Sequence, residues 1–131
     1  MAKSANTKFI PGPRLIDGSD LNGAFSQPVN SIETGIVATG TTIDDAYQLQ
    51  AAINVLGTVA ASTGVKLRNL DSGGIQTIYN DGANAVTVYA DDAIDGTAGA
   101  TGVALTNAKR AIFTRKPDGS WISAQLGVVS A

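Results

Sequence analysis

The pattern of apolar positions changes near residue 34 of this 131-residue chain. Before that point, apolar residues stand singly among glycines and prolines, without the sustained period of a helix or a strand. Pro-Gly-Pro at 11–13 cannot lie inside a helix or a central strand. The pattern therefore predicts an extended N-terminal arm over residues 1–33 and one β-domain over residues 34–131.

Short β-favouring runs recur through the second part of the chain. Two pairs of runs flank turn signals: 75–79 and 85–90 around Asn-Asp-Gly-Ala-Asn, and 111–115 and 120–126 around Lys-Pro-Asp-Gly. Both signals favour hairpins, because glycine accepts a positive φ and proline pre-sets φ at the first turn position. The spacing predicts a mainly β fold, a small antiparallel β-sandwich or barrel that is jelly-roll-like.

The segment 42–57 fits two structures. Thr42 and Asp45 have the spacing of a helix capping box, and Leu49 and Ile53 share one helical face. Ile53 also begins an alternation of apolar residues with period two, which is typical of a strand. The segment is therefore expected to form either one short helix or a strand.

Composition narrows the class of protein. Hydrophobic residues make up 44% of the chain but aromatic residues only 5%, so the core is thin and burial between subunits is the expected remedy. A net charge of −2 argues against a general nucleic-acid binder, and no apolar run is long enough to cross a membrane. The absence of cysteine excludes disulfides and fits assembly in a reducing cytoplasm.

Candidate chemistry is sparse. The chain has no histidine, no cysteine and a single glutamate, Glu33, whereas most hydrolytic, redox and metal chemistry uses at least one of these residue types. Asp91, Asp92 and Asp95 share a loop, but Ala93 stands where a calcium loop needs an oxygen ligand. A solvated turn is the favoured interpretation. The sequence predicts a protein that is not an enzyme and holds no metal or cofactor.

Two basic groups and one aromatic residue are candidates for contacts. Lys3, Lys8 and Arg14 make the arm basic, which suits a protein partner, solvated charges or, last, nucleic acid. A second basic group at 109–116 is expected to be a solvated face. Trp121, the single tryptophan, is a candidate for a subunit interface, with core packing and sugar stacking as alternatives.

Several motifs occur in a characteristic order. They are Thr-Val-Ala-Ala-Ser-Thr-Gly-Val-Lys-Leu at 58–67, Ile-Tyr-Asn-Asp-Gly-Ala-Asn-Ala-Val-Thr-Val-Tyr at 78–89, Ile-Asp-Gly at 94–96, Ala-Ile-Phe at 111–113 and Ser-Trp at 120–121. Their order resembles a module of tailed-bacteriophage virion proteins of the capsid decoration (cementing) or head-fibre-base type, over most of residues 42–126. Arg68 and Ala90 depart from that pattern, since proline is common at both positions. The resemblance implies a small β-module on the capsid exterior, often a trimer, without catalytic residues.

These expectations combine into one prediction. The chain is expected to be a capsid decoration protein, a homotrimer on the outer surface of the major capsid protein, assembled in the host cytoplasm. No small-molecule substrate, membrane or nucleic acid is expected as a partner. Arm residues expected to contact the capsid are Lys8, Phe9, Ile10, Pro11, Pro13, Arg14, Leu15, Ile16, Leu21 and Phe25. The alternatives are a tail, neck or fibre-attachment component, or a carbohydrate-binding module with Trp121 or Tyr89 exposed in a groove.

Overall fold

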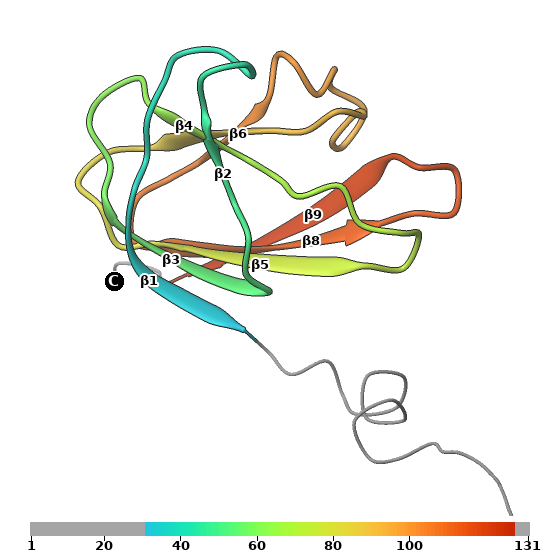
Figure 1. Cartoon of the computed structure of the whole chain (residues 1–131), viewed down its shortest axis with the longest axis horizontal. Coiled ribbons are helices and arrows are strands. Elements are labelled where there is room, and N and C mark those ends of the chain that lie inside the picture. Colours follow the sequence, from blue (N-terminus) through green and yellow to red (C-terminus); the bar gives the residue numbers. More distant parts are fainter. Residues whose placement is uncertain (1–30, 128–131) are drawn as a thin grey trace, which may run out of the picture. The chain divides into compact units, whose positions relative to one another are not determined.

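The computed structural model describes residues 31–127, which form nine strands and no helix (Figure 1). The strands are β1 (Ile32–Val37), β2 (Tyr47–Gln48), β3 (Ile53–Thr58), β4 (Gly64–Lys66), β5 (Ile75–Asn80), β6 (Val86–Tyr89), β7 (Val103–Leu105), β8 (Lys109–Arg115) and β9 (Trp121–Gly127). The prediction of a mainly β domain is confirmed. The arm residues expected to contact the capsid lie outside the described residues.

The strands form two sheets, which Figure 1 shows as two layers. The large sheet has the strand order β1-β3-β5-β8-β9, and the small sheet has the order β2-β4-β6-β7. From β1 to β6 the chain alternates between the sheets, so it winds around a shared core as in a β-helix. Strand β7 then completes the small sheet, and β8 and β9 complete the large one.

This winding corrects the predicted strand pairing. The pairs β1–β3, β3–β5, β2–β4 and β4–β6 are parallel, whereas β5–β8, β6–β7 and β8–β9 are antiparallel. The two layers agree with the predicted sandwich-like fold. Both sheets are mixed and do not close into a barrel, so the predicted all-antiparallel pairing and the barrel alternative were wrong. The physical reason is that each turn of the winding re-enters a sheet in the same direction, after crossing the other sheet.

The core lies between the two sheets. Its largest fully buried apolar side chains come from strands of both sheets and from the connections: Leu49, Leu56, Val65, Ile78, Val86, Val88, Ile94, Leu105, Phe113 and Trp121. Alternation along the strands places these residues on the facing surfaces of the sheets. The contacts between them fix which face of the large sheet points inward.

Three buried amide side chains satisfy backbone groups where the chain passes between sheets. Asn54, Gln76 and Asn80 are each 1% exposed or less. The Nδ2 of Asn54 donates to the Ala51 carbonyl at 2.9 Å, and the Nε2 of Gln76 donates to the same carbonyl at 3.0 Å. The Oε1 of Gln76 accepts from the Arg68 amide at 2.9 Å. The loops therefore need few bonds to water.

The segment 80–84 is a crossing between sheets, so the predicted hairpin there was wrong. Strand β5 belongs to the large sheet and β6 to the small sheet. A Cβ at Gly82 would lie 2.6 Å from the Cβ of Val59, so glycine is needed there for close packing. Asn80 bonds across the turn, donating to the Asn84 carbonyl at 2.9 Å and accepting from the Gly82 amide at 3.0 Å.

The predicted hairpin at 116–119 is confirmed. Strands β8 and β9 pair antiparallel over their whole length, and the Lys116 amide donates to the Ser120 carbonyl at 2.7 Å. Gly119 has a φ of +92°, as its place in the turn requires. Asp118 accepts from the amide and hydroxyl of Ser120 at 2.9 and 2.7 Å.

The segment 42–57 contains a single turn followed by strands, so the helix alternative was wrong. Asp45 Oδ1 accepts from the Thr41 and Thr42 amides, and the Ala46 amide donates to the Thr42 carbonyl at 3.0 Å. The capping-box spacing of Thr42 and Asp45 therefore belongs to a single turn and not to the start of a helix. From Ile53 the chain lies between β1 and β5 in the large sheet, where pairing on both sides outweighs local helix propensity.

Candidate functional site

The face of the large sheet that points away from the core is the candidate site, and we call it the outer face. Residues paired across neighbouring strands project from the same side of a sheet, so the register defines its members. In rows across the strands they are Ile75–Thr114–Ile122, Ile32–Ile53–Thr77–Ile112–Ala124 and Val55–Tyr79–Arg110–Leu126. Most of these side chains are apolar.

The outer face is exposed. Ile32, Ile75, Ile122 and Leu126 are 61%, 55%, 52% and 47% exposed, and they are four of the five large apolar residues so exposed among residues 31–127. Ile112, in the middle of the face, is half-buried by its neighbours within the sheet. An apolar surface gathered on one side of a soluble domain typically marks a site of interaction.

Arg110 is the one charged residue in these rows. Its guanidinium carbon lies 5.5 Å from the centre of the Tyr79 ring, and Nη1 donates to the Tyr79 hydroxyl at 3.2 Å. Its Nε is buried and has no hydrogen-bond partner within the described structure. A buried donor without a partner costs about 1–3 kcal/mol. The Nε itself is shielded from solvent, so a binding partner would reach Arg110 through the Nη end of its half-buried guanidinium.

A hollow of about 550 Å³ opens beside Arg110. It is lined by Tyr79, Asp81, Ala108, Lys109, Arg110, Leu126 and Gly127. The ion pairs among residues 31–127 join other side chains, so Asp81 does not neutralise Arg110. Lys109 and Arg110 outnumber the single carboxylate, Asp81, so the hollow has a net positive charge.

Trp121 lies on the inner side and is only 2% exposed. Its amide donates to the Ala93 carbonyl at 2.8 Å, and its carbonyl accepts from the Asp95 amide at 2.9 Å. The ring therefore packs within its own subunit, the second of the three alternatives, and offers no area for a subunit interface. Tyr89, the other candidate for stacking on a sugar, is 6% exposed and donates to the Thr41 carbonyl at 2.9 Å.

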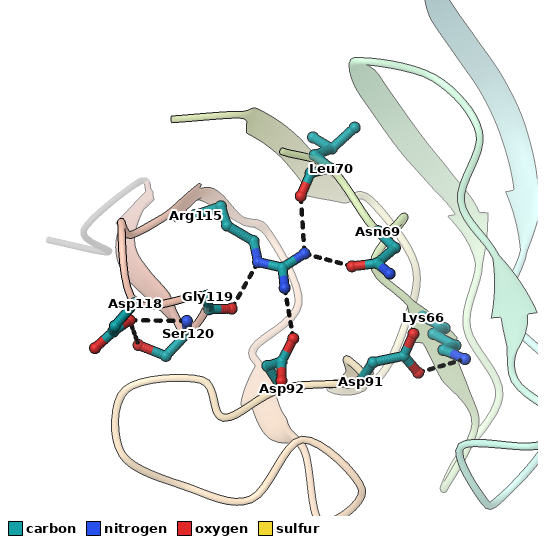
Figure 2. A network of polar contacts seen from close by, with 9 residues as sticks. All are labelled: Lys66, Asn69, Leu70, Asp91, Asp92, Arg115, Asp118, Gly119 and Ser120. Atoms are coloured by element: carbon teal, nitrogen blue, oxygen red, sulfur yellow. Dashed lines mark hydrogen bonds and ion pairs between the residues drawn. The ribbon is translucent and has the colours of Figure 1, made fainter. Parts of the chain in front are cut away.

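The basic group at 109–116 is divided between the two faces of β8, so it is not a single solvated face. Arg110 lies on the outer face, whereas Arg115 pairs with Trp121 on the inner side. Figure 2 shows Arg115 at the centre of a polar network. It donates to the Gly119 carbonyl at 2.6 Å, to the Leu70 carbonyl at 2.8 Å and to Asp92 at 2.5 Å. These bonds fasten three loops together.

The three aspartates at 91–95 have separate partners and form no metal site. Asp91 pairs with Lys66 at 2.9 Å, and Asp92 pairs with Arg115 (Figure 2). Asp95 accepts from the amide and hydroxyl of Ser123 at 2.8 and 2.5 Å. Within residues 31–127 no three carboxylates, histidines or cysteines are grouped as a metal ion requires.

The shifted pKa values have local causes. Hydrogen bonds from the backbone and hydroxyl of Thr42 lower the pKa of Asp45, and those from Ser120 lower the pKa of Asp118. The pKa of Tyr47 is raised, chiefly because its hydroxyl donates to Glu33 at 2.6 Å. These are turn and strand contacts outside the outer face.

Comparison with protein-family models, curated proteins and solved structures gives no match. The resemblance to phage virion proteins therefore stays a prediction from the motifs. Among residues 31–127 there is also no helix with the length and apolar character needed to span a membrane.

Sequence reasoning missed the outer face. Ile122 and Leu126 share one side of their strand and Trp121 the other, and this alternation does not say which side is exposed. The one available signal was on β8, where both faces carry apolar side chains, as Ile112 and Phe113 show. Apolar side chains on both faces of a strand are typical of strands covered on both faces, so this pattern favours a contact on the outer face.

Proposed function

We propose that this chain is a non-enzymatic capsid decoration protein that binds the outer surface of the major capsid protein and stabilises the head. The observation that carries the proposal is the apolar outer face, which nothing among residues 31–127 covers. Burial of such a face against another protein is favourable, by about 25 cal/mol per Å² of apolar surface. The order of the sequence motifs supplies the phage context.

The dimensions of the face indicate how the protein binds. Five strands spaced about 4.8 Å apart, with three rows of side chains, form a plane of roughly 300–400 Å². A stable interface buries about 800 Å² on each partner. The residues before β1, which the sequence predicts to be an extended arm, are the proposed second part of the contact, with their scattered apolar residues docking on neighbouring capsid subunits. The proposed homotrimer would multiply both contacts.

The test uses DNA-free shells assembled from the major capsid protein of the virus that carries this chain. Ile122→Asp places a carboxylate on the outer face, where burial without a partner is costly, so we expect shell occupancy to fall at least tenfold. Ala100→Asp, in an exposed loop away from the face, is the matched control and should keep wild-type occupancy. Equal occupancy for Ile122→Asp and wild type would refute the proposed role of the face.

A second variant tests the arm. Deletion of residues 2–30 should reduce occupancy while leaving the thermal unfolding of the β-domain unchanged. Unchanged occupancy would eliminate the proposed role of the arm without affecting the outer face. Many copies spread over the shell would support decoration, whereas a few copies at one vertex would indicate the tail, neck or fibre-attachment alternative.

A further inference from the structure

We propose that the outer face recognises an apolar segment of a different protein that carries a carboxylate, and that this carboxylate binds Arg110. The inference rests on the proposed function and adds the chemistry of the partner. It depends on the position of one cation within an otherwise uncharged face.

The geometry around Arg110 leaves room for an anion. Tyr79 occupies one side of the guanidinium, by ring contact and by one hydrogen bond, and Leu126 is its neighbour on β9. The Nε has no partner within the described structure but is itself shielded from solvent, so an incoming carboxylate would meet the Nη end of the half-buried guanidinium. A carboxylate accepts two parallel hydrogen bonds from a guanidinium, which a carbonyl or hydroxyl cannot do. The adjoining hollow of about 550 Å³ admits such a side chain.

Arg115, on the same strand, is an arginine whose guanidinium donors have hydrogen-bond partners. It donates to three carbonyl or amide oxygens and to Asp92, and it also lies 5.6 Å from the Trp121 ring. Arg110 has the corresponding aromatic contact but lacks the corresponding carboxylate. The missing carboxylate is the group that we assign to the partner.

Charge argues against a second copy as the occupant. The rows of the outer face contain Arg110 and no carboxylate. Two copies packed face to face about a two-fold axis would bury two arginines with no acid within the rows to pair them. A two-fold contact between copies through these rows is therefore disfavoured, and a different protein is the proposed occupant of the outer face.

A peptide array tests the chemistry of the face without the shell. Each pair of extended apolar peptides is identical except for a central Asp or Asn. The full-length chain should bind the Asp peptides at least tenfold more tightly, and Arg110→Met should abolish this preference. Lys116→Met, which removes an exposed cation of the β8–β9 turn that does not line the hollow, should retain the preference. Equal binding of Asp and Asn peptides by the wild type would overturn the inference.

The shell assay separates this inference from the proposed function. If wild type binds shells and Arg110→Met weakens binding roughly 30-fold, both stand. If shells bind wild type and Arg110→Met equally, the inference fails and the decoration function stands. If shells do not bind but the array shows the Asp preference lost with Arg110, the decoration function fails and the inference stands.

Two further outcomes would assign the face to another occupant and overturn the inference. In the first, the free chain is an oligomer that Ile122→Asp converts to monomer, which makes the face a contact between copies. In the second, deletion of residues 2–30 raises the affinity for Asp and Asn peptides alike, which makes the arm its occupant.

Discussion

Two arginines on β8 illustrate how surroundings decide the role of a side chain. Arg110 and Arg115 each lie over an aromatic ring, at 5.5 and 5.6 Å. Arg115 also meets several oxygen acceptors and so holds loops together, whereas Arg110 has only the Tyr79 hydroxyl. The first arginine stabilises the fold, and the second is available for recognition. Their side chains alternate across the strand, so neither role can be read from residue type.

Asn80 should be among the most sensitive polar positions in the core. It is 0% exposed and donates to the carbonyls of Asn84 and Leu105 at 2.9 and 3.0 Å. Asn80→Ala leaves these buried groups without partners, and we expect the free energy of unfolding to fall by about 2–3 kcal/mol. Urea denaturation measures the loss. Asn107→Ala, at an exposed position, should change stability by less than about 0.5 kcal/mol.

Asp45 should give the turn at 41–46 a pH dependence. The folded-state pKa lies below the usual 3.8 because the Thr42 amide and hydroxyl bond the carboxylate. The stabilisation is therefore present above pH 3.8 and is lost as the pH falls through the folded-state pKa. Asp45→Ala should be less stable than wild type near neutral pH, and the gap should close in acid. A gap in urea midpoint that stays constant down to the acid limit would contradict this assignment.

At the scale of elements, the β8–β9 hairpin depends on a single backbone conformation. Gly119 has a φ of +92°, and a Cβ there would meet only Arg115 Nη2 at an ordinary 3.5 Å. Gly119→Ala therefore introduces backbone strain without a clash, and we expect a loss of about 1 kcal/mol. Gly119→Asn should lose less, because asparagine tolerates positive φ better. If alanine and asparagine cost the same in thermal unfolding, strain is not the cause.

The elements that sequence predicts correctly are those determined by neighbours in the chain. The turn at 116–119 is local chemistry, and its hairpin was predicted with the right partners. The parallel pairs of the large sheet join Ile32 to Ile53 and Ile53 to Thr77, and no local signal encodes such distant partners. The Asp-Gly pair at 81–82 led to the wrong hairpin prediction, because glycine is required there for close packing against Val59 and not only in hairpin turns.

The candidate site was harder to predict than the fold class, for a physical reason. Alternation on β9 separates Ile122 and Leu126 from Trp121, but period two does not say which set faces the core. Trp121 lies on the inner side together with the more polar residues of β9. There its backbone bonds to loop residues, and its ring contacts Arg115. The apolar set was left on the outside, where only a partner can bury it.

At the scale of the whole molecule, the nine strands of residues 31–127 enclose one core, and no other part of this described region covers the apolar outer face. Loops are held by ion pairs and buried amides, so the domain presents the large sheet as a fixed surface. A preformed surface loses little entropy on binding, which suits a protein that must occupy many equivalent positions. Such a surface supports the proposed role in assembly.

Electron cryomicroscopy of virus shells saturated with this protein would show which side of the large sheet contacts the capsid protein. We expect the outer face, which carries Ile75, Ile112, Ile122 and Leu126, to lie against the capsid protein. An acidic side chain of that protein should lie against Arg110. A reconstruction in which the protein is bound while this side of the large sheet faces open solvent would contradict the account.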